Sequence, residues 1–174
     1  MKFQELILKR QSCRSFNPTR KVPEKTLKKI LEAGRMAPSA VGGQPYRLWA
    51  ATGETAEKVS KARIGEMNKF IEDADCFIAI TGHAYNVPAE RAEKTEGMGF
   101  RGIDIGLLAA HIICAAEQLG VASCMIGLFD EPVAREIIGC DERIELLIAL
   151  GYPTDGYEVR EKRRMAFDDL ITIL

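Results

Sequence analysis

Two clusters of basic residues, one near each end of the chain, could bind a phosphate. The first is the run Arg10 to Arg14, which reads Arg, Gln, Ser, Cys, Arg and brings two guanidinium groups and a hydroxyl into about one turn. The second is Lys162 with Arg164. Guanidinium and ammonium groups bind phosphate through charge-assisted hydrogen bonds. Each cluster alone is typical of a solvated surface, so the hypothesis requires that the two clusters meet at one phosphate.

A loop rich in glycine and proline could bring backbone amides close to a flat ligand. Its candidate residues are Pro38, Ser39, Ala40, Gly42 and Gln44. Glycine permits a close backbone approach, and a glutamine amide offers both a donor and an acceptor. The alternative is an ordinary helix-to-strand connection, for which the same composition is typical. The sequence contains neither a Walker loop nor a dinucleotide fingerprint.

A third candidate segment is Met125, Ile126 and Gly127, at the end of a short apolar run. The segment is typical of a core strand, but Gly127 allows another close backbone approach. Two cysteines, Cys13 and Cys124, suggest a thiol enzyme as an alternative, although no histidine lies near Cys13 in the sequence.

Five cysteines without a Cys-x-x-Cys pair, together with only two histidines, do not predict a metal site or a disulfide framework. The formal net charge of -1 gives no field that would attract nucleic acid or an anionic membrane. No run approaches the roughly 20 apolar residues that span a bilayer, and residues 1–10 lack the apolar core of a secretory signal. We therefore expect a cytoplasmic protein.

Hydrophobic spacing predicts one α/β domain over residues 1–174 that positions these candidates at the ends of its elements. Helices are expected over 3–10, 54–71, 103–119 and 132–138, and from 23 to a break by Pro38. Strands are expected over 46–52, 76–81, 122–126 and 144–150. The terminal residues 169–174 are mostly strand formers, and such a strand must pair with an edge of its own sheet or of a partner's sheet. Residues 82–101 have little apolar periodicity and are expected to form a mobile cover.

In five ordered segments the chain resembles the FMN-dependent nitroreductase family. Residues 10–16 are similar to the opening motif of that family, and residues 37–46 are similar to its Ala-Pro-Ser and Gln-Pro-Trp loop. Residues 104–110 resemble the start of its central helix, and residues 120–130 its following strand and turn. Residues 150–153, followed by Lys162 and Arg164, resemble its closing Gly-Tyr-Pro and basic tail.

This resemblance implies an α+β fold with a central mixed or antiparallel sheet flanked by helices. It also implies a homodimer that holds FMN at the subunit interface, with the C-terminal segment exchanged onto the partner. The residues expected to contact FMN are Arg10, Gln11, Ser12, Arg14, Pro38, Ser39, Ala40, Gly42, Gln44, Met125, Ile126, Gly127, Lys162 and Arg164.

Within this set the resemblance assigns separate roles. Arg10, Ser12, Lys162 and Arg164 would hold the phosphate and ribityl end, whereas residues 38–40 would come from the other subunit. Arg14 would lie near the N1 and C2 carbonyl edge of the flavin and act as the catalytic charge, because a fixed cation there stabilises the anionic reduced ring.

Three positions depart from the family pattern. Gly42 stands where many members have Asn, which removes a side-chain contact to the ring, and Tyr46 and Met125 each replace a Trp.

The activity implied is ping-pong reduction of a small-molecule electron acceptor, such as a nitroaromatic or a quinone, by NAD(P)H. The alternatives within the family are reductive dehalogenation and flavin processing. A non-catalytic FMN-binding protein and a structural dimer without a ligand stay open as further alternatives.

Overall fold

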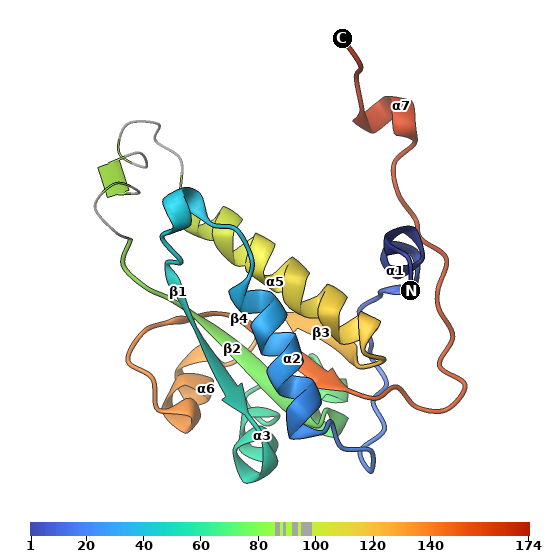
Figure 1. Cartoon of the computed structure of the whole chain (residues 1–174). Helices are drawn as coiled ribbons and strands as arrows, with labels where there is room; N and C mark the ends of the chain where they lie inside the picture. The colour runs from blue at the N-terminus through green and yellow to red at the C-terminus, as the bar shows by residue number, and fades with distance from the viewer. Residues whose placement is uncertain (86–87, 89, 92–93, 95–98) are drawn as a thin grey trace.

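The chain forms a four-stranded antiparallel sheet between two layers of helices, in a computed structural model that describes residues 1–85, 88, 90–91, 94 and 99–174 (Figure 1). The strand order is β1 (Tyr46–Ala51), β2 (Cys76–Gly82), β4 (Ile144–Gly151) and β3 (Ala122–Ile126). All three pairs among these four strands are antiparallel, so of the two expected sheet types the structure has the antiparallel one. The α+β class is confirmed.

Helices cover both faces of the sheet, which explains why its central strands are apolar without alternation. On one face lie α2 (Glu24–Arg35) and α5 (Phe100–Gln118), which pack with Ile78, Ile80 and Ile148. On the other face lie α3 (Gly53–Val59) and α6 (Glu131–Ile138), which pack with Phe77, Leu147 and Ala149. In β2, residues 76–81 are all buried.

The predicted helices over 103–119 and 132–138 are present. Each is followed by a glycine that adopts the left-handed backbone conformation. Gly120 follows α5 with a φ of 75°, and Gly139 follows α6 with a φ of 73°. At the start of α6 the Asp130 carboxylate accepts a hydrogen bond from the backbone amide of Val133 (3.3 Å).

The helix predicted over 54–71 is wrong in its second half. The helix α3 ends at Val59, and the chain then follows a loop that closes in a 3₁₀ turn, η2 (Lys69–Asp73). Gly65 (φ 56°) and Asn68 (φ 59°) adopt left-handed backbone angles, which a continuous right-handed helix does not accommodate. Met67, which lies in the loop between α3 and η2, is 47% exposed.

The N-terminal segment runs along the outer edge of β3 after α1 (Phe3–Lys9). The Cys13 amide donates to the carbonyl oxygen of Ser123 (2.9 Å), and the Asn17 amide donates to that of Tyr152 (2.8 Å). The segment that leaves β4 therefore runs beside residues 10–17.

The predicted terminal strand is absent from this described part of the chain. Residues 167–170 form the short helix α7 (Phe167–Leu170), and residues 171–174 are extended and exposed. Figure 1 shows this tail standing away from the body of the domain. A strand needs a neighbouring edge for its hydrogen bonds, and none lies beside the tail. Exchange of the tail onto a partner stays a prediction.

Part of the proposed mobile cover over 82–101, residues 86–87, 89, 92–93 and 95–98, lies outside the described residues. The described part includes the end of β2, the start of α5, and Tyr85, whose hydroxyl donates to Asp104 in α5 (2.8 Å). Among the helices of the described residues, none combines the length and the apolar character needed to cross a membrane.

Candidate functional site

The two basic clusters lie together in the folded chain. They line a first hollow of about 510 Å³, which we call the phosphate hollow. Its lining residues are Arg10, Gln11, Ser12, Arg14, Arg160, Glu161, Lys162, Arg163 and Arg164. The N-terminal contribution comes from the end of α1 and the edge segment, and the C-terminal contribution comes from the extended chain that follows β4.

Gln11 fastens these two segments to each other. Its side-chain amide donates to the carbonyl oxygen of Glu158 (2.9 Å). Its side-chain oxygen accepts from the backbone amide of Arg160 (3.1 Å) and from the Nε of the same residue (3.2 Å). Both ends of the amide are therefore engaged within the protein, so Gln11 acts as a brace, and its expected direct contact with a ligand stays a prediction.

Arg160 is a residue of this hollow that the sequence analysis did not select. Its guanidinium donates to the carbonyl oxygen of Ser12 (2.8 Å), while the Lys162 ammonium donates to that of Arg10. Alternate residues of an extended segment point to the same side. The spacing of Arg160, Lys162 and Arg164 could therefore have indicated a shared face.

The phosphate hollow has an excess of positive charge. Burial and the nearby Arg10 and Arg164 guanidinium groups lower the pKa of Lys162 from its ordinary value. A lowered lysine pKa means that the charged form is disfavoured by its surroundings. A bound dianion would relieve that repulsion, so the donor set fits a phosphate.

Arg14 also lines a second hollow, of about 330 Å³, which we call the ring hollow. The other lining residues are Met67, Asn68, Phe70, Cys124, Met125, Ile126, Gly127 and Leu128. The backbone amide of Arg14 donates to the Tyr157 hydroxyl (3.0 Å), which fixes the chain where the two hollows meet. The structure thus brings the predicted residues 125–127 next to Arg14.

The ring hollow is walled mainly by apolar side chains and backbone. Met125 is 42% exposed and Leu128 is 52% exposed. Partly exposed apolar side chains of this kind suit an aromatic ring system, and Arg14 adds one positive charge to the lining.

The loop with Pro38, Ser39, Ala40, Gly42 and Gln44 lines neither hollow within the described chain. It forms the turn η1 (Ala40–Gly42), which connects α2 to β1 and lies well apart from α1 and the tail in Figure 1. Within one chain, therefore, the predicted cofactor-binding residues do not all line the same pair of hollows.

Internal hydrogen bonds hold this loop in shape. The Gln44 amide donates to the Ser39 hydroxyl (3.0 Å), and the Gln44 side chain donates to the carbonyl oxygen of Arg35 (3.2 Å). The Ala40 amide donates to the carboxylate of Asp104 (3.0 Å), which is only 2% exposed. Asp104 is a second structural residue near the site that the sequence did not lead us to name. A charged residue within an otherwise apolar helix usually has a buried polar partner, and that pattern could have indicated it.

Both candidate thiols are buried. Burial raises the pKa of Cys13 and that of Cys124, although nearby arginines oppose the shift. A raised thiol pKa leaves less of the reactive thiolate at neutral pH, which argues against a thiol enzyme.

Comparison with known proteins agrees with this geometry. The sequence model of the family described as "Nitroreductase family" matches residues 7–74 and 65–152. The chain belongs to the nitroreductase family. The resemblance found in the sequence is thereby confirmed, and the matched ranges contain the edge segment, the loop around η1 and both walls of the ring hollow.

Relatives of this nitroreductase-family chain align over most of its length. An "NADPH-dependent oxidoreductase" of Staphylococcus aureus is 26% identical, over 94% of this chain and 69% of the relative. A nitroreductase family protein from Streptococcus pneumoniae has a TM-score of 0.82 at 22% identity, over 99% of this chain and 100% of that protein. A protein from Exiguobacterium sibiricum, solved in complex with FMN, has a TM-score of 0.79 at 22% identity, over 100% of this chain and 98% of that protein.

Proposed function

We propose that this nitroreductase-family chain is an FMN-dependent oxidoreductase that takes electrons from NAD(P)H and passes them to a small-molecule acceptor. The observation that carries the proposal is the convergence of cations from both ends of the chain on the phosphate hollow, directly beside the ring hollow. The family match, the relative named as an NADPH-dependent oxidoreductase and the neighbour solved with FMN support the same cofactors.

The residues of the phosphate hollow fit the phosphate of FMN. Arg10, Lys162 and Arg164 would carry the charge, and the Ser12 hydroxyl would add a hydrogen bond. The pKa of Lys162 is lowered by burial first and then by the Arg10 and Arg164 guanidinium groups, and a bound anion would offset the repulsion that these groups cause.

Arg14 would act on the ring end of the cofactor. When bound, FMN would supply the electron chemistry, by taking a hydride from NAD(P)H and passing the electrons to the acceptor. The Arg14 guanidinium lines both hollows, so it would stand between the phosphate end and the ring end. A fixed positive charge there would stabilise negative charge that develops at the edge of the ring.

The donor and the acceptor would bind in turn at one place. With the flavin ring held in the ring hollow, the exposed face of that ring would be the surface open to both molecules. Sequential stacking on that face would give a ping-pong order and would favour flat acceptors such as nitroaromatics or quinones.

A second copy of the chain would complete the site. The loop with Pro38, Ser39 and Ala40 lies apart from both hollows of its own chain, so a partner could supply it. Apolar side chains are exposed on α1 (Phe3, 67%), on α5 (Ile103, 49%) and on the tail (Ile173, 84%). Burial of such exposed apolar side chains against a second copy would be favourable, which supports a homodimer with exchanged tails.

A flavin analysis followed by steady-state kinetics tests this function. The purified protein should be yellow, release FMN on denaturation and oxidise NADH or NADPH in the presence of a quinone or a nitroaromatic. A colourless protein that binds no added FMN would overturn the proposal. A yellow protein without NAD(P)H oxidation would instead indicate a non-catalytic flavoprotein.

A further inference from the structure

A surface loop between α3 and β2 forms one wall of the ring hollow. This loop, residues 60–72, contributes the side chains of Met67, Asn68 and Phe70 to the lining beside Arg14. It has few backbone hydrogen bonds of its own in its middle part, such as that from the Met67 amide to the carbonyl oxygen of Ile64 (3.1 Å). Something other than regular secondary structure must therefore set its shape.

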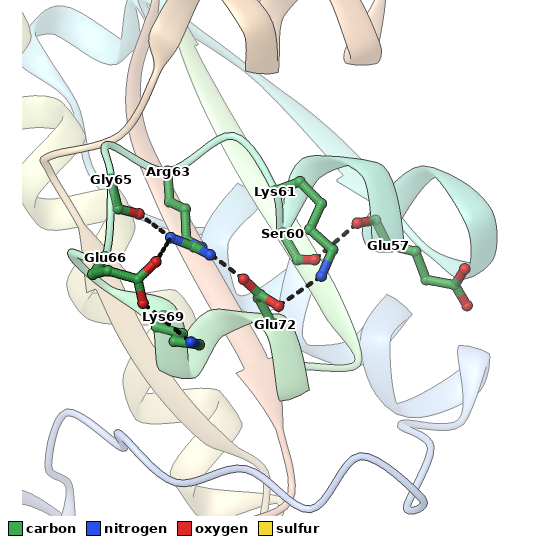
Figure 2. A network of polar contacts seen from close by, with 8 residues as sticks. All are labelled: Glu57, Ser60, Lys61, Arg63, Gly65, Glu66, Lys69 and Glu72. Carbon is green, nitrogen blue, oxygen red and sulfur yellow. Dashed lines mark hydrogen bonds and ion pairs between the residues drawn. The ribbon is translucent and has the colours of Figure 1, made fainter.

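An ion-pair network closes the loop on itself, as Figure 2 shows. The Nε of Arg63 contacts one carboxylate oxygen of Glu72 (2.6 Å), and the Lys61 ammonium contacts the other (2.6 Å). The Arg63 guanidinium also donates to the carbonyl oxygen of Gly65. Arg63 thus joins the beginning of the loop to its end and holds the turn at Gly65.

The central pair of this network is shielded, whereas its outer pair is not. The side chains of Arg63 and Glu72 are 19% and 23% exposed, but those of Glu66 and Lys69 are 77% and 67% exposed. Solvent screens an exposed pair strongly and a shielded pair less. The Arg63–Glu72 pair is therefore the part of the network that can fix the loop.

The same loop is tied to the opposite wall of the ring hollow. The Asn68 side chain donates to the carbonyl oxygen of Leu128 (2.9 Å), and the Asp130 amide donates to that of Ala62 (3.0 Å). Leu128 belongs to the segment that follows β3 and lines the hollow. A shift of the loop would therefore change both walls together.

The ends of the loop do not depend on the ion pair. Val59 and Ile71 are fully buried and Ala62 is 1% exposed, so packing anchors the backbone on both sides. Loss of Arg63 should loosen residues 64–70 while the surrounding fold persists. The effect of Arg63 on the site can therefore be tested separately from any effect on the stability of the fold.

We propose that Arg63 and Glu72 are positioning residues, whose ion pair holds Met67, Asn68 and Phe70 as a fixed wall against the ring system and the acceptor. The inference deepens the proposed function and rests on it. Geometry alone carries it: the pair closes the loop, and the loop lines the hollow that Arg14 shares.

The first test measures the loop without any ligand. In Arg63→Ala and Glu72→Gln, hydrogen–deuterium exchange of residues 64–70 should be faster than in the parent protein. Lys69→Ala is the matched control, because it removes only the exposed contact to Glu66 within the same network. Unchanged exchange in both central variants would overturn the inference whether or not the chain binds FMN.

The second test measures the site. For Arg63→Ala and Glu72→Gln we expect KM for a quinone acceptor to rise about tenfold and the flavin absorption band to shift, because a loosened wall misplaces the bound rings. FMN content should stay at the parent level, since the phosphate hollow is untouched. Arg63→Lys should be intermediate, because a lysine can pair with Glu72 but lacks the fork that also reaches Gly65.

The outcomes separate the two proposals. A parent protein without FMN or NAD(P)H oxidation would overturn the proposed function and this inference with it. Faster loop exchange beside an unchanged KM and an unchanged flavin spectrum would overturn this inference alone.

Discussion

The side-chain amide of Gln11 donates a hydrogen bond to the carbonyl oxygen of Glu158 across 147 residues of sequence. With the two bonds from Arg160 to the same side chain, it fastens the end of α1 to the chain that follows β4. The phosphate hollow therefore forms only when the chain folds, because its two lining segments, residues 10–14 and 160–164, are far apart in the sequence.

The brace predicts an effect on cofactor binding without a direct contact. Gln11→Ala should weaken FMN binding about tenfold, since loss of hydrogen bonds worth about 1 kcal/mol each frees the segment with Arg160 and Lys162. Titration of the flavin-free protein with FMN measures the change. Gln118→Ala, at the exposed last residue of α5, should bind FMN as the parent does. Equal affinities of the two variants would contradict the role given to Gln11.

Arg14 is expected to raise the midpoint potential of the bound flavin. Arg14→Gln should lower the flavin midpoint potential and slow reduction by NAD(P)H, because the variant removes the one cation among the described residues that line the ring hollow. A dye-equilibration titration measures the potential, and Lys25→Gln on the exposed face of α2 is a charge-matched control. A potential equal to that of the parent would reject the assignment.

The exposed tail is expected to serve the dimer. Deletion of residues 169–174 should shift the protein toward monomer and release flavin. It removes Leu170, Ile171 and Ile173, the exposed apolar side chains that would be buried against the partner. Light scattering after size-exclusion chromatography reports the mass. Asp169→Asn keeps all the apolar residues and should stay dimeric. A dimer that survives the deletion would show that other surfaces suffice.

Gly34 is expected to be essential for the contact between α2 and α5. A Cβ at this position would lie 2.7 Å from Cγ1 of Ile112, a fully buried side chain. Gly34→Ala should therefore lower the free energy of unfolding by about 1–3 kcal/mol through overpacking. At Gly102 nothing lies within 4 Å of such an atom, so Gly102→Ala in the same denaturant titration should not destabilise. Destabilisation by Gly102→Ala alone would contradict the packing argument.

Burial of Cys76 predicts a loss of stability in base. Desolvation raises the pKa of the Cys76 thiol from 9.0 to about 12, so the folded state keeps its proton where the unfolded state loses it. Stability should thus fall as pH rises from about 9 toward 12, in proportion to the difference in bound protons. The slope of unfolding free energy against pH should be smaller in Cys76→Ala, where this thiol is missing. Parallel slopes would mean that Cys76 titrates normally.

The sequence predicted elements best where local chemistry sets their ends. The strand over 122–126 has the expected bounds, and the helix that ends at Ile138 stops before Gly139, as a left-handed glycine requires. The helix over 54–71 failed because its apolar spacing continues past Val59, whereas Gly65 and Asn68 turn the chain. Periodicity alone does not detect such turns.

The site was less predictable because its contacts are distant in sequence. The role of Gln11 depends on where Glu158 lies, and the role of Arg160 depends on the direction of an extended segment. Neither relationship can be inferred from the composition of the sequence around these residues. The loop around Gly42 connects a helix to a strand, as one interpretation of its composition predicted, and it lies apart from Arg14 within one chain, as a loop supplied by the other subunit would. Its contact with a flavin stays a prediction.

The bond between Gln11 and Glu158 also sets an order of events during biosynthesis. Residues 158–164 are made after all four strands of the sheet, so a growing chain at that stage carries half of an anion site without its complement. A bound anion can therefore contact both basic clusters only after residues 158–164 have been made.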